Sequence, residues 1–600
     1  MISPKVLLTA AIPWFLSWPT AQADPMRGRI EHFQADAELL SRHWSISGDS
    51  EAELARERKL LLDWQARLKE VDYAGLSPDQ GIDYLLFRNE LESSLAGLER
   101  REGARKDLSA WLPARSAIDA LADARVRGEL LVPENAAAAL APLPEKLEKL
   151  QEKLKAAKES SKKPEKESGE KKEPAETEAP SKKGEASASP LPGPYEALRV
   201  AETTEELAGS LKRWHENYDG FTPEFAWWVK EPYDRTIKAL EDYAKFLREE
   251  IAGVKGKDED PLLGKVIGAD ELRRQLRFEF IPYAPAELIA LAEREFSWCE
   301  EQMKAAAREM GLGDEWKKAL ARTKLRYVKP GDQEKVAREE GREAIDFVKS
   351  RGLVTVPPDC EEWWGTRMLS PGEQKHTPYA AYGGHDMLIA YASHDMKHAD
   401  KLMTMRGNSR PFMHNVVPHE LIPGHHLQNF MAARHRPYRR MFSTPFFVEG
   451  WALYWEMRLW DLGYHDTPEE KIGALFWRMH RCARIIITLK FHLGEMEPGE
   501  MVKFLIDRVG HEPFGAKSEV RRYIKGDYAP LYQAGYMLGG LQLRALHREI
   551  VGGGKMTEKA FHDALLTLGP IPVELVRASL LGLPLKPDHA AGWKFDAVGR

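Results

Sequence analysis

The chain has 600 residues, of which 30% are charged, and a formal net charge of -6 at pH 7. That length allows several domains. The acidic balance lacks the basic excess that is typical of nucleic-acid-binding proteins, so nucleic acid is not an expected partner. Three scattered cysteines indicate neither a disulfide framework nor a cysteine-based zinc site.

The N-terminus has the pattern of an export signal. Lys5 precedes an apolar run from Val6 to Trp18, and Ala21-Gln22-Ala23 forms a small-residue cleavage site. We predict that residues 1–23 are a signal peptide cleaved after Ala23, and that the protein is periplasmic or secreted. No later segment has the roughly 18 or more consecutive apolar residues that a membrane span requires, so no membrane span is predicted.

Amphipathic helices are the dominant predicted element after the signal peptide. Apolar residues recur at three- and four-residue spacing among charged ones, which predicts helices within residues 54–68, 85–98, 207–211, 237–247 and 288–303. We predict two helical regions, residues 24–157 and 196–350, followed by residues 351–600, which contain the candidate functional motifs. Together they are expected to form one continuous fold.

A charged low-complexity segment separates the two helical regions. Residues 158–189 contain no Val, Ile, Leu, Met or aromatic residue. Such a composition cannot bury enough apolar surface to offset the entropy that is lost on ordering. We therefore predict a disordered insertion over residues 158–195.

Few segments alternate in the manner of strands. Arg326-Tyr-Val328 and Val354-Thr-Val356 are the candidates for a small antiparallel sheet. Gly383 and Gly384 either form an ordinary glycine turn or lie at a sheet edge where a substrate backbone pairs as an added strand.

The most informative segment is His419-Glu420-Leu-Ile-Pro423-Gly424-His425-His426. In the zincin motif HExxH, two histidines four residues apart bind one zinc ion and the glutamate acts as the base. Here Pro423 occupies the position of the second histidine, and proline cannot bind a metal. A later histidine can replace it only if the helix is broken.

Helix geometry decides which histidine is the better candidate. On a regular helix His426 would lie about 10.5 Å beyond His419, and His425 about 9 Å beyond it, which is too far for one zinc ion. Pro423 interrupts the helical hydrogen bonds, and Gly424 permits the backbone angles that absorb extra residues. Two absorbed residues would place His425 at the ligand position, so we favour His425, with His426 as the alternative.

A second segment, Phe446-Phe-Val-Glu449-Gly-Trp-Ala-Leu-Tyr-Trp-Glu456, carries two acids among apolar residues. Glu449 is positioned to be a third ligand from a later helix, since carboxylates are rarely buried unless they are paired or bind a metal. Its alternative role is a helix N-terminal acid that the helix dipole favours. Glu456 can orient a ligand imidazole from behind.

These two segments resemble the signature HExxPGHxxQ followed by EGWALYxE of the bacterial domain of unknown function 885 (DUF885) family. These proteins are thought to be zincin-like metallopeptidases, distantly similar to carboxypeptidase Taq-type and oligopeptidase-type enzymes. The resemblance implies His419, His425 and Glu449 as ligands of one zinc ion, and Glu420 as general base. It also implies a mainly α, zincin-like helical metallopeptidase fold with the small sheet beside the active-site cleft.

Two further patterns of that family can be placed on the sequence. Arg484 and His492 match an arginine and a histidine eight residues apart, and Tyr536 matches the tyrosine of a Pro-Gly-Gln-Ala-x-x-Tyr run. Tyr536 or His492 can donate a hydrogen bond to the oxyanion. Arg484 can bind a substrate carboxylate, or it can form a structural ion pair.

We therefore predict an exported zinc metallopeptidase that acts on short peptides, with carboxypeptidase, dipeptidase and oligopeptidase modes unresolved and the oligomeric state undetermined. Two alternatives remain open. One is a non-catalytic exported peptide-binding protein of the same fold, and the other is a zinc hydrolase of non-peptide amides or esters.

Overall fold

The computed structural model describes residues 24–46, 48–161, 191–256, 260–374, 377–526 and 528–597. The chain is mainly helical, as predicted, with one small sheet. The predicted signal peptide and residues 162–190 of the predicted insertion lie outside the described residues. At the two ends of that insertion the prediction of disorder is wrong, because residues 158–161 and 194–195 are helical.

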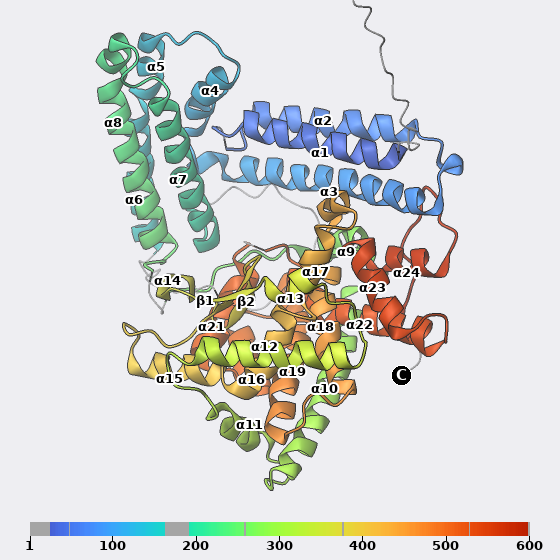
Figure 1. Ribbon diagram of the computed structural model, residues 1–600. Helices are drawn as coiled ribbons and strands as arrows, with labels where there is room; N and C mark the ends of the chain where they lie inside the picture. The colour runs from blue at the N-terminus through green and yellow to red at the C-terminus, as the bar shows by residue number, and fades with distance from the viewer. Residues whose placement is uncertain are drawn as a thin grey trace, which may run out of the picture.

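Three long helices form a layer at one side of the molecule, drawn in blue in Figure 1. They are α1 (Pro25–His43), α2 (Glu51–Lys69) and α3 (Pro78–Leu108). Their apolar residues belong to the same hydrophobic core as the C-terminal half of the chain. The predicted helices within residues 54–68 and 85–98 are confirmed in α2 and α3.

A second group of helices stands beside this layer and has its own hydrophobic core, built from residues between Leu112 and Ala252 (Figure 1). It consists of α4 (Arg115–Val126), α5 (Pro133–Leu140), α6 (Leu143–Ser161), α7 (Pro194–Glu216) and α8 (Pro223–Phe246). Residues 24–157, predicted as one helical region, therefore contribute to two cores, because the long helix α3 ends where this helical bundle begins.

The remaining helices belong to the C-terminal part of the chain. They are α9 (Gly268–Phe278), α10 (Pro285–Glu309), α11 (Trp316–Lys324), α12 (Gln333–Ser350), α13 (Pro358–Glu362), α14 (Pro371–Gln374), α15 (His398–Gly407), α16 (Arg410–Glu420), α17 (His425–Ala432), α18 (Pro445–Asp461), α19 (Pro468–Leu493), α20 (Pro498–Phe504), α21 (Pro513–Ile524), α22 (Tyr532–His547), α23 (Glu558–Leu568) and α24 (Val573–Leu581). Among them the long helix α19 packs against several others, chiefly α10, α16 and α22.

Proline marks the start of many of these helices, including α16, α18 and α19. Its fixed φ suits the first turn, and its missing N–H removes a donor that would have no partner there. At α19, Thr467 and Glu470 add a capping box, in which each side chain bonds the backbone N–H of the other. The helix starts are thus encoded locally.

Glycines let the helices of this core approach closely. A Cβ atom at Gly473 of α19 would lie 2.3 Å from the carbonyl oxygen of Pro411 in α16. A Cβ atom at Gly539 of α22 would lie 1.9 Å from the carbonyl oxygen of Phe446 in α18. Any larger side chain would force these helices apart, so the two glycines fix the spacing of the helices that build the site.

The sheet has three strands, β1 (Gly365–Met368), β2 (Ala380–Tyr382) and β3 (Asp386–Ile389), in the order β1-β3-β2. β2 runs antiparallel to β3, whereas β1 runs parallel to it. The sheet is therefore mixed, and the prediction of an antiparallel sheet is wrong for β1.

The two predicted strands, residues 326–328 and 354–356, are also wrong. Both segments are irregular connections whose backbones bond single groups instead of a neighbouring strand. The carbonyl of Arg326 accepts a hydrogen bond from the Arg410 N–H, and the Thr355 N–H donates to Asp563. Alternating Val and Thr residues indicate a strand only where a partner strand is available.

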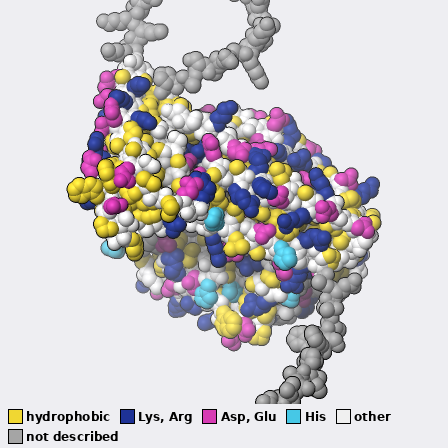
Figure 2. All heavy atoms as spheres, turned by 90° about the horizontal axis from the view of Figure 1, so that it is seen from above, with side chains coloured by type: hydrophobic (Ala, Val, Ile, Leu, Met, Phe, Trp, Pro, Cys, Tyr) yellow, Lys and Arg dark blue, Asp and Glu magenta, His cyan; other side chains and the backbone are white. Residues whose placement is uncertain are grey.

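The surface seen in Figure 2 carries interspersed Lys, Arg, Asp and Glu side chains, as expected of solvated helices. Within the described ranges, none of the helices combines the length and apolarity needed to cross a bilayer.

Candidate metal centre

The helix that carries His419 breaks where Pro423 and Gly424 predict it. α16 ends at Glu420 and α17 begins at His425. Between them the chain folds back, so that the Gly424 N–H donates to the carbonyl of Pro418 at 2.9 Å. A Cβ atom at position 424 would lie 1.8 Å from the carbonyl oxygen of His419. Only glycine fits there, and the predicted distortion of the helix is confirmed.

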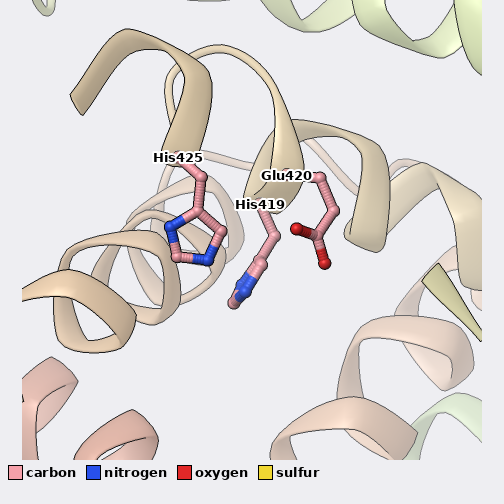
Figure 3. Close-up of side chains that lie close together, drawn as sticks. All are labelled: His419, Glu420 and His425. Carbon is pink, nitrogen blue, oxygen red and sulfur yellow. The ribbon is translucent and has the colours of Figure 1, made fainter. Parts of the chain in front are cut away.

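This fold-back brings two imidazoles and one carboxylate together. Nε2 of His425 lies 3.2 Å from Oε2 of Glu449, and Nε2 of His419 lies 3.8 Å from the same oxygen. Figure 3 shows both rings projecting in the same direction from the ends of their helices, with Glu420 beside His419. All four side chains are buried.

His426, the alternative ligand, is directed elsewhere. Its Nε2–H donates to the carbonyl of Cys360 at 3.0 Å, and its Nδ1 lies 3.1 Å from the hydroxyl of Tyr382. Both ring nitrogens are therefore engaged outside the cluster. Of the two histidines, His425 is the one that faces His419 and Glu449.

Glu449 is held in place by neighbours from two other segments. The indole N–H of Trp451, two residues along α18, donates to the carbonyl of Pro423 at 2.9 Å and fixes α18 against the fold-back. The Tyr532 hydroxyl of α22 donates to Oε1 of Glu449 at 2.5 Å. One carboxylate oxygen is thus taken by Tyr532, and the other faces the imidazoles.

Glu456 supports His419 from behind, as its sequence position allows. Its Oε1 lies 2.6 Å from Nδ1 of His419, and its Oε2 accepts a hydrogen bond from Asn415 at 2.8 Å. A carboxylate at Nδ1 fixes the ring orientation and leaves Nε2 as the nitrogen that faces the cluster.

The cluster perturbs the pKa values of its members. Burial by itself would lower the pKa of His419, but hydrogen bonds to Glu449 and Glu456 raise it to about 9. Burial would raise the pKa of Glu449, but the charges of His425 and His419 hold it well below its usual range. The carboxylate thus needs nearby positive charge, which either protonated imidazoles or a bound cation can provide.

The cluster lies in the wall of a cavity of about 440 Å³. Seven of the predicted site residues line this cavity: His419, Glu420, His425, Glu449, Arg484, Gly384 and Tyr536. The Tyr536 ring stacks parallel to the His419 ring, with 6.2 Å between the ring centres. Burial raises the pKa of Tyr536 to about 12, so its hydroxyl keeps its proton at neutral pH.

Two predicted residues do not line the cavity. Gly383 lies in the turn between β2 and β3, where its N–H donates to the carbonyl of Asp386, while Gly384 follows with a φ of +87°. The two glycines thus form a turn, and the strand before them, β2, is an edge strand of the sheet, so the geometry of both interpretations is present. Substrate binding at Gly383 and Gly384 stays a prediction. His492 is buried elsewhere, and burial lowers its pKa to about 4.

The position of His492 follows from helix geometry. Eight residues separate it from Arg484, which on α19 amounts to about 12 Å along the helix axis. Trp477, Arg481 and Arg484 of α19 line the cavity, and His492 lies beyond the last of them along the helix. His492 therefore has no geometry for contact with a substrate in this cavity.

Several cavity residues were not predicted. Arg481, Arg522, Glu519, Tyr379 and Tyr532 all line the cavity. Two of them had a usable signal, because residues three or four apart share one helix face. Arg481 precedes Arg484 by three positions, and Tyr532 precedes Tyr536 by four.

Of the two roles predicted for Arg484, the structural ion pair is present, and the binding of a substrate carboxylate stays a prediction. Nη2 of Arg484 donates to Glu519 at 2.9 Å, and these two side chains form the structural ion pair. Nε of Arg484 donates to the Tyr523 hydroxyl at 2.9 Å. Its Nη1 has no hydrogen-bond partner among the described residues.

Two further groups of acids and histidines are close enough to hold a metal ion, namely His547–Glu558–His562 and Glu340–Glu343–His414. In both groups, side chains from outside the group already bond a candidate ligand. Nε2 of His562 lies 2.7 Å from the Tyr454 hydroxyl, and Arg410 donates to Glu340 at 2.9 Å. Neither group lines the cavity.

Comparison with known proteins agrees with the resemblance seen in the motifs. The family model of a bacterial protein of unknown function, DUF885, matches residues 45–580. No curated protein matches the chain.

Two solved structures share the fold. One is a proposed lipoprotein of unknown function from Shewanella oneidensis, with a TM-score of 0.65, 16% identity, and coverage of 93% of this chain and 99% of that chain. The other is a proposed lipoprotein from Colwellia psychrerythraea, with a TM-score of 0.56, 14% identity, and coverage of 93% and 98%. At such identities the likeness shows the fold alone.

Proposed function

We propose that this chain, which belongs to the DUF885 family of bacterial proteins, is an exported zinc-dependent metallopeptidase that hydrolyses short peptides. The observation that carries the proposal is the convergence of His419, His425 and Glu449 at the cavity wall, with Glu420 beside them.

The donor set fits one zinc ion. Ligands bound tetrahedrally at about 2.0–2.1 Å lie roughly 3.3 Å from one another. The separations of 3.2 and 3.8 Å between the imidazole nitrogens and the Glu449 oxygen are close to that value. Two imidazoles and one carboxylate are also a typical ligand set of catalytic zinc.

Glu420 is best placed to be the base and not a ligand. A carboxylate oxygen of Glu420 lies within 4.8 Å of a nitrogen of each imidazole. Oε2 of Glu449 is nearer to both rings, at 3.2 Å from His425 and 3.8 Å from His419. When bound, zinc would polarise the scissile carbonyl and lower the pKa of the attacking water. Glu420 would take the proton of that water and deliver it to the leaving nitrogen as the C–N bond breaks.

Two other parts of the wall have roles in the same reaction. Tyr536 stacks on His419 and keeps its proton, so its hydroxyl can donate to the oxyanion that forms during attack. The edge strand β2 lines the cavity, and the side of it that does not pair with β3 can pair with an extended peptide.

The size of the cavity supports short peptides as substrates. About 440 Å³ is within the range of small-ligand pockets and holds a few residues at a time. Because helices surround the cavity, its candidate catalytic residues lie inside it. The backbone of a folded substrate protein would not reach them there.

The proposed location is outside the cytoplasm. The two solved relatives of this fold are described as lipoproteins, which are exported proteins. The sequence of residues 1–23 has the features of an export signal.

The test is to purify the mature chain, measure its zinc by elemental analysis, and assay a panel of fluorogenic peptides beside amide and ester substrates. We expect about one zinc ion per chain and peptide hydrolysis that a chelator abolishes and zinc restores. Peptide binding without turnover would instead support a non-catalytic binding protein. Turnover of esters or non-peptide amides alone would support the other hydrolase class.

A further inference from the structure

Three arginines, Arg481, Arg484 and Arg522, line one wall of the cavity, and we call them the arginine wall. Arg484 and Arg481 lie over the ring of Tyr536, at 4.4 and 5.0 Å from its centre. Because the same ring stacks on His419, only the width of one aromatic side chain separates the arginine wall from the metal centre.

The arginine wall carries more positive charge than its carboxylate neighbours balance. Glu519 lies 2.9 Å from Arg484 and 3.8 Å from Arg522, and Glu456 lies 3.5 Å from Arg481. Three guanidinium groups thus share two carboxylates, and Glu456 also serves His419. Glu420 and Glu449 line the same cavity on the side of the imidazoles, so the unmatched guanidinium charge is local to the arginine wall. A buried charge is costly without a partner, so this wall favours an anionic ligand group.

Arg484 is the member best prepared to bind that group. Its side chain is 4% exposed, and its Nε and Nη2 are fixed by Tyr523 and Glu519. Among the described residues, Nη1 has no partner. The guanidinium therefore has one fixed edge and one buried donor that lacks a partner, and a buried donor without a partner is costly until an acceptor reaches it.

A buried chain of side chains stabilises this arrangement. The Tyr523 hydroxyl donates to Glu519, and Nε2 of His480 lies 3.5 Å from the same carboxylate. Nδ1 of His480 lies 2.9 Å from Nε2 of His511. Burial lowers the pKa of His480 to about 3, so this ring is uncharged at neutral pH. The carboxylate of Glu519 therefore forms its ion pair with Arg484 and not with His480.

We propose that Arg484, positioned by Glu519 and Tyr523, binds the C-terminal carboxylate of the peptide, so that the enzyme removes residues from the C-terminus. This inference rests on the proposed peptidase function. Consecutive Cα atoms are about 3.8 Å apart, so a carboxylate one or two residues beyond the scissile bond spans the distance from the metal centre to Arg484. Water adds to the scissile carbonyl, the C–N bond breaks, and the released residue keeps its carboxylate at Arg484.

The test compares N-acetylated Ala-Phe with its C-terminal amide, which differ only in the charge of the end group. A hydrogen bond to a charged group contributes enough to change binding by roughly 10- to 100-fold. We therefore expect kcat/KM of the intact protein to be about 10- to 100-fold lower for the amide. Arg484→Gln should bring this ratio close to one, and Arg484→Lys should retain part of it.

A matched control is Arg478→Gln on the same helix. Arg478 is also buried and only partly paired, with Glu295 at 2.9 Å, but it does not line the cavity. Its substitution should leave the ratio between acid and amide unchanged, whatever it does to stability. If Arg484→Gln does not fold, the comparison of the two peptides on the unmodified protein still decides the question.

Binding separates this inference from the proposed function. Both peptides are titrated calorimetrically into the Glu420→Gln protein, where turnover does not interfere. Equal hydrolysis of acid and amide overturns the role of Arg484 and leaves the peptidase intact. If Glu420→Gln binds the acid more tightly than the amide, but the unmodified protein hydrolyses neither peptide, the carboxylate site is kept and the peptidase is overturned. If the protein neither hydrolyses the peptides nor prefers the acid, both proposals are wrong.

Discussion

The helical bundle α4–α8 and the helices around the cavity bury polar groups in different ways. In the bundle, four of the six buried polar residues are hydroxyls, such as Thr204, which donates to the carbonyl of Val200 one turn earlier. The other two are the carboxylates Asp119 and Asp123, and Asp119 forms an ion pair with Arg105 of α3 at 2.8 Å. Around the cavity, buried groups such as His419, Glu449 and Glu519 are charged or titratable, and their partners come from distant helices.

This difference separates a folding role from a functional one. A hydroxyl that bonds its own helix adds little to fold specificity and costs little to bury. A buried carboxylate or imidazole costs several kcal/mol unless it is paired, so a cluster of them at one cavity is expensive for stability alone. Such clusters are typical of sites that bind ions or perform proton transfer.

The largest expected effect is that of Glu420→Gln. Since general base catalysis contributes about 10²–10⁴-fold, turnover should fall by at least that range. Zinc content should stay at the level of the unmodified protein, because Glu449 is the nearer carboxylate. Elemental analysis and peptide hydrolysis measure both quantities, and full activity in this variant would refute the base assignment.

The ligand assignment is tested by the pair His425→Ala and His426→Ala. Both histidines are adjacent and buried, but only His425 faces Glu449, while His426 bonds Cys360. We expect His425→Ala to lose most of the bound zinc and His426→Ala to retain it. The reverse result would show that the helix distortion presents the other imidazole.

Tyr536→Phe should have the next largest effect. Removing one donor to an oxyanion typically costs about 10²–10³-fold in kcat. Because the phenyl ring can still stack on His419, zinc content and KM should change little. Steady-state kinetics with one peptide measure the effect, and an unchanged kcat would leave Tyr536 as a wall residue only.

How much of this site could be predicted from the sequence depends on how local the cause is. The break between His419 and His425 was predictable, because Pro423 and Gly424 act on the backbone at their own positions. The helices were predictable from apolar spacing in the same way. Glu449 could be proposed as a metal ligand because a carboxylate among aromatic residues is rarely buried unless it is paired or binds a metal.

What could not be predicted depends on contacts between distant segments. The pairing of Glu519 with Arg484 joins α21 to α19, and no local pattern indicates it. The strand β1 pairs in parallel with β3 across an intervening segment, so periodicity within residues 365–368 carries little information. The prediction that His492 bonds the oxyanion rests on a family pattern alone. Its distance from Arg484 along α19 places it beyond the cavity.

Glu456→Gln probes a smaller effect, that of the group behind His419. The amide retains the size of the side chain but loses its charge, which fixes the imidazole through Nδ1. Partners of this kind are typically worth 10–100-fold in metal affinity. Zinc competition with a chromophoric chelator measures this affinity, and a change of less than about threefold would contradict a supporting role.

The smallest effect is expected in the bundle, for Thr204→Val. The carbonyl of Val200 keeps its place in the helix when the hydroxyl is removed, so the free energy of unfolding should change by no more than about 1 kcal/mol. Zinc content and kcat should not change, because α7 contributes no residue to the cavity wall. Chemical denaturation gives the stability and elemental analysis the metal. If Thr204→Val altered zinc binding as much as Glu456→Gln does, the two cores would be coupled, and the cluster of charged groups at the cavity would no longer be a functional region separate from the bundle.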